Sequence, residues 1–240
     1  MPQNWTNNKK NDMKTGLIGY GYWGKILFSK LEKLSSVKFV CTSKDDYLSK
    51  LDLVEWVFIA TPNETHYKIV KECISKGKNV FCEKPLTLSY KDSLELFLLA
   101  EKYNVKLYVD DVFNYRHESK IISRREGILN VYWASPTTNY LYNNLYHDLY
   151  LLYPLFHNPY YPIEIQIESN ITINNTIFEY VNSPIKKHYM DDIDLTHKPT
   201  SNDALSEMIK NVLYGNPNYL YNTQISLYSN KIINIIEQMS

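Results

Sequence analysis

The sequence predicts an α/β protein in two parts: a doubly wound parallel sheet, then a smaller α+β domain whose sheet is mostly antiparallel. Between residues 14 and 115, short apolar strands alternate with amphipathic helical stretches five times, a rhythm typical of βαβ units. After residue 115 the strands lengthen and alternate apolar with polar residues, while the helices are segregated from them. We expect domains at 14–115 and 116–240, after a disordered polar tail at 1–13.

The predicted elements of the first domain follow in order. Strands are expected within residues 15–21 and at Val37–Cys41, Leu53–Ala60, Asn79–Cys82 and Lys106–Asp110. Helices are expected at Gly24–Leu34, from an Asn63 N-cap to a Gly77 that ends the helix, and from a Ser89 N-cap to about Tyr103. Because parallel strands need right-handed crossovers, these strands form one sheet that is covered on both faces.

The second domain is expected to place its strands in series. They are predicted at Ile128–Ala134, Ile163–Glu168, Ile171–Tyr180 and His188–Leu195, with a hairpin turn at Asn174 and Asn175. Helices are predicted around Tyr146–Phe156, Asn202–Leu213 and Gln224–Glu237.

The composition narrows the class of protein. The 26 basic and 26 acidic residues cancel, so no charge excess favours nucleic acid or an anionic membrane as a partner. No apolar run approaches the roughly 18 residues that a membrane-spanning helix needs. The three cysteines, Cys41, Cys73 and Cys82, have neither a CxxC nor a metal-ligand spacing. We therefore expect reduced core thiols, a cytoplasmic protein and no metal site.

The first candidate site is the loop Gly19-Tyr-Gly21-Tyr-Trp-Gly24, which fits GxGxxG between a strand and a helix. In this pattern Gly19 permits a tight turn, Gly21 lets the backbone approach a pyrophosphate, and Gly24 permits close packing of helix on strand. The helix N-terminus, with Tyr22 and Trp23, then faces the phosphate charge. The alternative is a glycine-rich turn without a ligand, but its place at the first crossover favours a nucleotide-binding Rossmann domain.

The end of the second strand predicts which dinucleotide binds. Thr42, Ser43 and Lys44 stand where an acidic residue would favour NAD, and hydroxyls followed by a cation suit the 2′-phosphate of NADP. NAD stays open if Asp45 or Asp46 contacts the ribose instead. A capping serine beside a solvated lysine is the alternative without a ligand.

The stretch VFIATPNETHYKIVKECISKGKNVFCEKPLTLS, residues 57–89, is more specific than the glycines. Together with GYGYWG it resembles the Gfo/Idh/MocA oxidoreductase family, named for glucose–fructose oxidoreductase and inositol dehydrogenase. The matching pieces are Ala60-Thr61-Pro62, His66, Gly77-Lys78-Asn79-Val80 and, above all, Glu83-Lys84-Pro85. The resemblance extends from Lys14 to about Arg116 and becomes thin afterwards.

The resemblance implies roles for these residues. Lys84 would lie beside the nicotinamide and stabilise charge on the substrate oxygen, and Glu83 would orient this lysine or contact the cofactor. Thr61, Pro62 and Asn63 would line the nucleotide. His66 would lie on the helix beneath the nucleotide, or equally would be a packing histidine.

In the second domain the resemblance implies a catalytic histidine on the first helix, which is His147 in this chain. An imidazole suits proton exchange with a sugar hydroxyl. The residue one helical turn earlier is Asn143, where the family carries an aspartate, and Asp148 is adjacent on another face of the helix. Tyr115 and Arg116 are further candidates for binding substrate, with Asn143 and His147. An interfacial histidine is the alternative for His147.

These assignments predict an enzyme that transfers hydride between NADP(H), or NAD(H), and a carbinol or carbonyl carbon of a sugar, sugar nucleotide or cyclitol. The alternative is a catalytically weakened or inactive cofactor-binding partner protein of the same fold, suggested by Asn143 and by a second domain shorter than the family's. The resemblance also implies a homodimer or tetramer through the C-terminal sheet.

Overall fold

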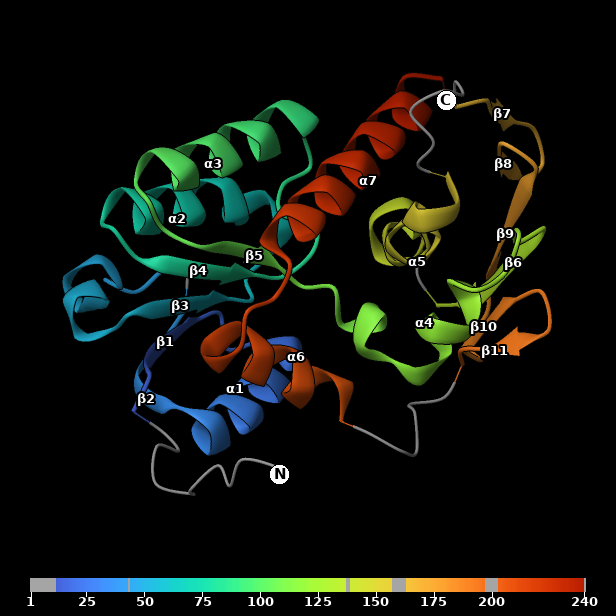
Figure 1. Ribbon diagram of the computed structural model, residues 1–240. Helices are drawn as coiled ribbons and strands as arrows, with labels where there is room; N and C mark the ends of the chain where they lie inside the picture. Colours follow the sequence, from blue (N-terminus) through green and yellow to red (C-terminus); the bar gives the residue numbers. More distant parts are fainter. Residues whose placement is uncertain (1–11, 43, 137–138, 157–162, 197–202, 240) are drawn as a thin grey trace, which may run out of the picture. The chain divides into compact units, whose positions relative to one another are not determined.

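The computed structural model describes residues 12–42, 44–136, 139–156, 163–196 and 203–239. The chain forms two compact units. The first comprises residues up to Asp110 together with Leu205–Thr223, and the second comprises Asp111–Ala204 and the chain from Gln224 onward. Figure 1 labels the helices and strands of both units.

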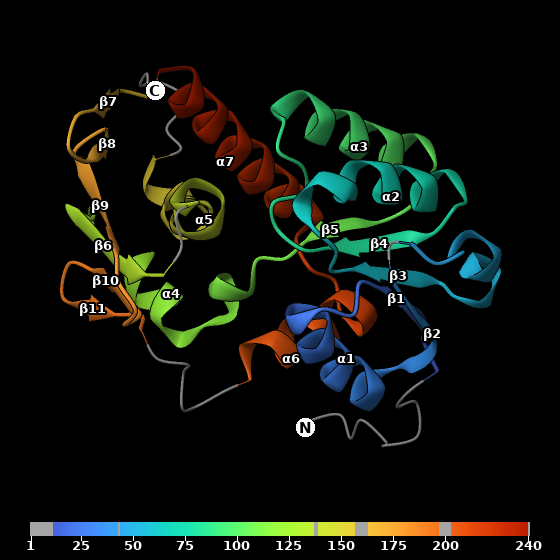
Figure 2. The same ribbon diagram turned by 180° about the vertical axis from the view of Figure 1, so that it is seen from behind.

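The first unit is built on a parallel sheet in the order β2-β1-β3-β4-β5. Its strands are β1 (Lys14–Ile18), β2 (Ser36–Cys41), β3 (Trp56–Ile59), β4 (Asn79–Cys82) and β5 (Leu107–Val109). Helices α2 (Asn63–Ser75) and α3 (Tyr90–Lys102) cover one face, and α1 (Tyr22–Leu34) and α6 (Ala204–Tyr214) cover the other (Figures 1 and 2). The predicted doubly wound parallel sheet is therefore confirmed.

The apolar strands supply a core on each face of this sheet. On the side of α2 and α3, aliphatic strand residues such as Val57 and Val80 join the buried stripe of Ile69, Val70 and Ile74. On the other face an aromatic row crosses three strands: Phe58 stacks on Phe81 at 4.8 Å between ring centroids, and Phe81 on Tyr108 at 6.2 Å. Burial on both faces explains why the strands alternate so little.

Two details of the first unit differ from the sequence expectation. The connection from β2 to β3 contains the 3₁₀ segment η1 (Leu48–Leu53) and no α-helix among its described residues. Helix α2 begins at Asn63, so Pro62 is its N-cap, and the Thr65 amide donates to the Pro62 carbonyl at 2.9 Å. The other predicted caps are confirmed: Ser89 Oγ accepts from the Asp92 amide, and Gly77, with φ +69°, follows the end of α2.

The edge strand β5 pairs with β4 alone among the described strands. The side chain of Asn222, from α7 (Tyr219–Met239), binds the outer side of this strand. Asn222 Oδ1 accepts a hydrogen bond from the Val109 amide at 2.9 Å, and Asn222 Nδ2 donates one to the Val109 carbonyl at 2.8 Å. The side-chain amide thus makes both bonds that a neighbouring strand would make to this residue.

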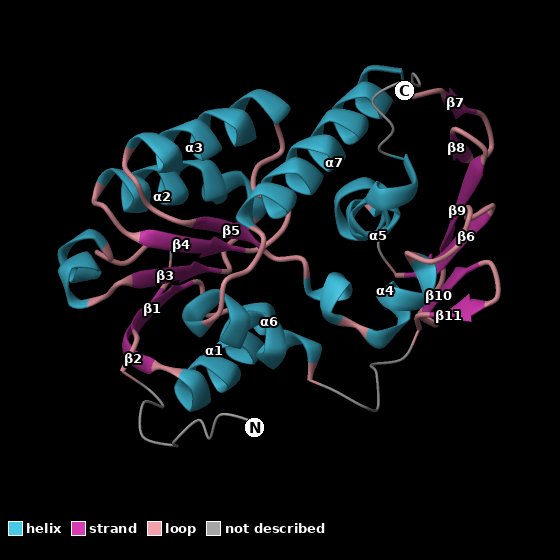
Figure 3. Cartoon of the chain, viewed as in Figure 1, coloured by secondary structure: helices cyan, strands magenta, loops and turns pink. Residues whose placement is uncertain are grey.

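The second unit contains a mixed, mostly antiparallel sheet in the order β11-β10-β6-β9-β8-β7 (Figure 3). Its strands are β6 (Asn130–Ser135), β7 (Ile165–Ile167), β8 (Ile171–Ile173), β9 (Thr176–Asn182), β10 (Lys187–Met190) and β11 (Ile193–Asp194). Only β6 and β9 pair in parallel among these described strands. The predicted strand 171–180 is two strands joined at the predicted turn, where Asn174 has φ +52°.

The helices of the second unit are α4 (His117–Ile122) and α5 (Tyr146–Phe156), preceded by the 3₁₀ segment η2 (Val112–Tyr115) and the π-helical turn η3 (Leu141–Leu145). The later part of α7 packs on α5, where Tyr146 donates its hydroxyl to Asn230 Oδ1 at 2.9 Å. Tyr150 and Ser226 join their hydroxyls at 2.7 Å in the same buried interface.

The three cysteines are free and buried, as predicted. Burial raises the pKa of Cys73 to about 12 and holds that of Cys82 well above its ordinary value, so both stay thiols near neutral pH. Among the described helices none is both long and apolar enough to cross a membrane. Across the described ranges, no group of three or more His, Cys, Asp or Glu side chains is arranged to hold a metal ion.

Candidate functional site

The glycine loop lies where β1 ends and α1 begins, and its glycines meet different surroundings. Gly19 has φ +104°, and a Cβ there would lie 2.3 Å from the Ala60 carbonyl oxygen. A Cβ on Gly24 would lie 2.0 Å from the Gly19 carbonyl oxygen. These two positions therefore need glycine for the fold alone, because any side chain would meet backbone.

Gly21 is different, since a Cβ at this residue would meet nothing within 4 Å. Its φ of −74° also suits an ordinary residue. Gly21 is the N-cap of α1, and no side chain caps the helix there. Neither a steric contact nor the backbone conformation therefore requires glycine at 21, whereas a pyrophosphate approaching the backbone and the first amides of α1 would need this space. The residues present fit a dinucleotide.

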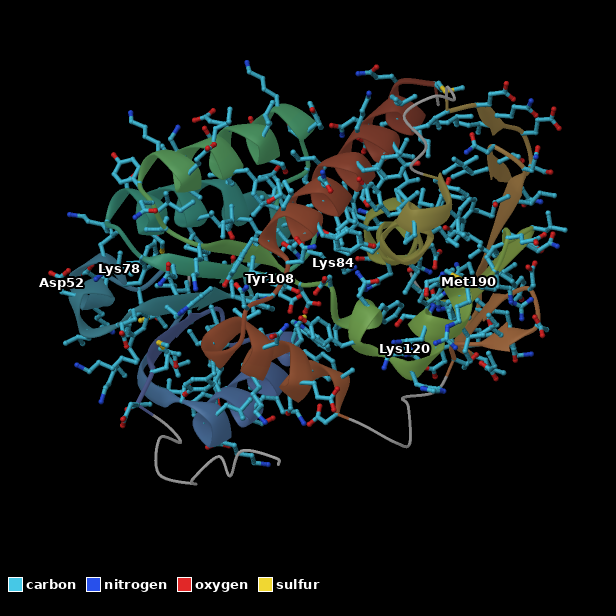
Figure 4. All side chains as sticks on the ribbon, in the orientation of Figure 1. Asp52, Lys78, Lys84, Tyr108, Lys120 and Met190 are labelled. Atoms are coloured by element: carbon cyan, nitrogen blue, oxygen red, sulfur yellow. The ribbon has the colours of Figure 1, made fainter. Side chains whose placement is uncertain are left out.

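Lys84 lies at the same edge of the sheet, two residues after the end of β4 (Figure 4). Its side chain is half-buried, and the peptide bond to Pro85 is cis. Lys78 precedes β4 and so marks the opposite end of the strand, where its ammonium lies 3.7 Å from Asp52. In parallel sheets ligands bind beyond the carboxyl ends of the strands, which is the end that carries Lys84 and the glycine loop.

Glu83 connects these two parts of the site. It is 9% exposed, and its Oε1 accepts a hydrogen bond from the indole nitrogen of Trp23, the residue before Gly24. A second carboxyl group is close by, that of Asp110, which follows β5 and is 1% exposed. Burial, reinforced by Asp110, raises the pKa of Glu83 well above its ordinary value, and Lys84 opposes this rise.

His66 supports the strand ends from within the core. It is fully buried on α2, with Nδ1 2.8 Å from the Pro85 carbonyl oxygen and Nε2 2.9 Å from the Thr61 carbonyl oxygen. Burial lowers the pKa of His66, although both carbonyl contacts favour the cation. These contacts favour the packing role over direct contact with a nucleotide, because both nitrogens already bridge the loops after β3 and β4.

The residues predicted beside the nucleotide are more open. Pro62 and Tyr22 are exposed, and Thr61 and Asn63 are half-buried. The Thr65 hydroxyl lies 2.7 Å from that of Thr61 and fixes the start of α2.

At the end of β2, Thr42 and Lys44 are exposed, and Ser43 lies outside the described residues. Asp45 Oδ2 accepts from the Thr42 amide at 2.5 Å, and Asp46 Oδ1 accepts from the Ser49 amide at 3.2 Å. The Thr42 amide lowers the pKa of Asp45, and the Ser49 side chain, followed by the Ser49 amide, lowers the pKa of Asp46.

In the second unit, His147 is half-buried near the start of α5, and its ring stacks on Phe113 with 4.2 Å between centroids. Asn143 is exposed within the π-helical turn that precedes α5. Such turns often occur at functional sites.

Asp148 takes a different direction from its neighbour His147. It is fully buried, and its Oδ1 lies 2.8 Å from Nε2 of His188. Its Oδ2 accepts from the Trp133 indole at 2.7 Å and from the Tyr180 hydroxyl at 3.2 Å. Tyr180, Trp133 and His188 are laterally paired on β9, β6 and β10, so one carboxylate from α5 binds a row across three strands.

Arg116 and Tyr115 end the segment η2. Arg116 is 7% exposed, donates to the Leu195 carbonyl at 3.1 Å and to Glu118 at 3.2 Å, and lies over the Phe113 ring. These contacts are those of a structural cation. Tyr115 is half-buried.

The structure thus brings together the glycine loop, Glu83 and Lys84 of the first unit, whereas His147, Asn143, Tyr115 and Arg116 belong to the second. Sequence reasoning missed Asp110 and the Asp148 cluster. Asp110 stood at the end of a predicted strand, as Glu83 does, which was a usable signal. The sequence carries no such signal for the row of Tyr180, Trp133 and His188, because this row depends on strand pairing between distant segments.

A known family matches most of the first unit, from the residue after the glycine loop onward. Residues 25–111 match the model of the Gfo/Idh/MocA family, described as an oxidoreductase family with an NAD-binding Rossmann fold. This part of the chain is similar to the Gfo/Idh/MocA oxidoreductase family. The resemblance to this family is thereby confirmed: the match includes the Glu83-Lys84-Pro85 segment and begins directly after the glycine loop.

The proteins with similar sequences include both oxidoreductases and a hydratase. An uncharacterized oxidoreductase of Streptococcus pneumoniae is 30% identical over 53% of this chain and 40% of its own length. The 2,7-anhydro-N-acetylneuraminate hydratase of Escherichia coli is 27% identical over 48% of this chain and 36% of its own. The matched part of the chain therefore spans well under half the length of either relative.

Solved structures share the fold across most of the chain. A dehydrogenase from Thermus thermophilus, in complex with NAD and UDP-GlcNAcA, has a TM-score of 0.72 with 14% identity. The likeness covers 94% of this chain and 94% of that one. At this identity the likeness shows that the two proteins share a fold.

Proposed function

We propose that this chain is a Gfo/Idh/MocA-type, NAD(P)-dependent oxidoreductase that acts on a sugar, a sugar nucleotide or a cyclitol. The hydride would pass between nicotinamide and a carbinol or carbonyl carbon, which is the chemistry that the cofactor supplies when bound. The observation that carries the proposal is Gly21: its Cβ position is open, at the edge of the sheet that also bears Lys84.

In this proposal Lys84 acts on the substrate oxygen. Its ammonium stabilises the negative charge that develops on oxygen when hydride leaves or arrives. Glu83, buried behind it and bound by Trp23, keeps a carboxyl group near this ammonium. The half-buried side chain of Lys84 suits a cation that is partly desolvated yet reachable.

We assign proton exchange to His147 in the second unit. An imidazole titrates near neutral pH, so it can take the hydroxyl proton of an alcohol or return it to an oxyanion. Stacking on Phe113 fixes the plane of the ring. Because Asn143 carries no charge to stabilise an imidazolium, we expect Asn143→Asp to raise turnover, whereas no activity in either form would contradict this role.

We assign NADP(H) as the preferred cofactor. Thr42 and Lys44 are exposed at the end of β2, where a hydroxyl and a cation can meet a 2′-phosphate. Asp45 and Asp46 have backbone amides of their own loop as partners, which supports this assignment.

A sugar nucleotide is supported as the substrate class by the Thermus thermophilus dehydrogenase, whose complex holds NAD and UDP-GlcNAcA. The buried thiols support a reducing compartment, the cytoplasm. A homodimer or tetramer through the second sheet is supported by the exposed apolar residues Ile177 and Val181 on β9.

The test is a titration with NADPH and NADH, side by side, that follows cofactor fluorescence and thermal shift. We expect both to bind, NADPH more tightly, and sugar nucleotides then to be oxidised or reduced. Lys84→Met should keep dinucleotide binding within about threefold and lose turnover, while Lys78→Met, which removes a lysine at the other end of β4, should change neither. Binding of neither dinucleotide would refute the proposal.

A further inference from the structure

Two carboxyl groups meet at neighbouring strand ends in the first unit. Cys82 pairs with Val109 at the last residues of β4 and β5, so Glu83 and Asp110 leave the sheet side by side. The Asp110 amide donates to the Cys82 carbonyl at 2.9 Å, which extends the ladder by one residue. Neither side chain is exposed by more than 9%, and the Asp110 carboxyl group is close enough to that of Glu83 to raise its pKa.

A hydrogen bond between these two neighbouring carboxyl groups needs a proton on one of them. An ionised carboxyl group only accepts hydrogen bonds, so one of the two must carry a proton for the bond to exist. Two buried carboxylates in contact would also repel each other in a medium that screens charge poorly. One proton and one negative charge on the pair would satisfy both requirements.

The groups around Glu83 and Asp110 can stabilise one negative charge on the pair. Glu83 faces the Trp23 indole N–H from α1, the Lys84 ammonium on its own loop, Asp110 from the end of β5, and the Cys82 thiol of β4. A raised thiol pKa keeps Cys82 neutral. Of these groups, Trp23 lies two residues after Gly21, so the hydrogen bond from its indole joins the pair to the glycine loop.

We propose that Glu83 and Asp110 share one proton, and that dinucleotide binding at the glycine loop requires this proton to be retained. The proposal rests on the proposed function and adds Asp110 to it as a positioning residue that acts through Glu83 and Trp23. When the proton is lost, a second negative charge appears at the edge of the sheet where an anionic pyrophosphate binds. The repulsion weakens binding of the dinucleotide, and the Glu83 carboxylate accepts a stronger hydrogen bond from the Trp23 indole.

A shared proton predicts how the Kd of the dinucleotide depends on pH. When binding requires one retained proton, the Kd of the dinucleotide rises with pH by up to tenfold per pH unit above the point where the proton leaves. Because the fold raises the pKa of Glu83, this rise begins above the ordinary carboxyl range. The stability of the protein without ligand depends on pH in the same direction. The contribution of the shared proton to the unfolding free energy is full below the ordinary carboxyl pKa, and it is lost as pH rises through the raised pKa.

The experiment compares the wild type with Asp110→Asn and Trp23→Phe. The Kd of NADPH is measured by fluorescence from pH 5.5 to 9, and thermal unfolding of the protein without ligand is measured over the same range. Asp110→Asn should bind with a Kd that does not rise with pH, because an amide donates to Glu83 at every pH. Trp23→Phe removes a donor that favours the ionised Glu83, so its rise in Kd should begin at a higher pH.

The unfolding measurement separates this proposal from the proposed function. If no dinucleotide binds but the unfolding temperature falls with rising pH in the wild type and not in Asp110→Asn, the shared proton stands and its link to binding fails. If the pH profiles of wild type and Asp110→Asn coincide in both measurements, the shared proton is wrong. Asp52→Asn is the matched control, since Asp52 is almost fully exposed in its ion pair with Lys78 and should leave both profiles unchanged.

Discussion

The open space at Gly21 makes Gly21→Ala the sharpest test of the glycine loop. The added methyl meets nothing within 4 Å, and φ −74° is ordinary for alanine. Two effects on stability oppose each other. Replacing glycine stabilises by about 0.4–1 kcal/mol by restricting the unfolded chain. Alanine is a poorer N-cap than glycine for α1, which costs roughly 0.5–1 kcal/mol. The unfolding free energy should therefore change by less than about 1 kcal/mol.

Binding should change far more than stability. The methyl would occupy the space through which a phosphate approaches the first amides of α1. Losing one charge-assisted hydrogen bond to a phosphate oxygen costs about 1.5–3 kcal/mol, which corresponds to a roughly 10- to 150-fold rise in Kd. The assay combines NADPH fluorescence titration with urea unfolding of the same preparations.

Gly19→Ala provides the contrast, because φ +104° and the Ala60 carbonyl at 2.3 Å penalise any side chain in the fold itself. That variant should lose stability by more than about 3 kcal/mol, since backbone strain and a clash add together. Wild-type affinity in a stable Gly21→Ala protein would refute the reasoning, since the space at Gly21 would then serve no phosphate.

Two further predictions concern the buried side chains of His66 and Asp148. Because burial lowers the pKa of His66 in the folded protein, the unfolded chain takes up the proton first, and the unfolding free energy should fall by up to about 1.4 kcal/mol per pH unit below pH 6.5. Urea unfolding from pH 7.5 to 5.5 should show this slope in the wild type and a smaller one in His66→Gln. Asp148→Asn should lower the unfolding free energy by about 2–4 kcal/mol, because the amide replaces an acceptor of three hydrogen bonds with a group that also donates.

Each of these has a matched control. His117 is exposed, so His117→Gln should keep the wild-type slope with pH; equal slopes in His66→Gln and the wild type would disprove the assignment. Asp192→Asn breaks an exposed ion pair with Arg125 and should cost less than about 1 kcal/mol. A cost for Asp148→Asn no greater than that of Asp192→Asn would show that the buried carboxylate is dispensable.

The sequence predicted the parts of this molecule that local patterns determine. The order of strand, GxGxxG and helix placed Gly19, Gly21 and Gly24 correctly at the first crossover, and Glu83 and Lys84 at a strand end. These predictions succeed because period, turn chemistry and caps act over a few residues.

What failed depended on contacts between distant segments. The donors to Asp148 come from three strands whose pairing, including the parallel pair of β6 and β9, no local pattern specifies. The brace formed by His66 depends on carbonyls 5 and 19 residues away. The π-helical turn before α5 also had no signal, since its residues fit an ordinary helix equally well.

Asn222 also bears on how copies of this protein can associate. The outer edge of a sheet normally offers unpaired amides and carbonyls, onto which a strand of another molecule can add. At Val109 both groups are already bound by one side-chain amide from α7. β5 spans only Leu107–Val109, so this single residue closes much of the edge. A strand arriving from a second copy would have to displace Asn222 first, which protects this end of the sheet from edge-to-edge aggregation.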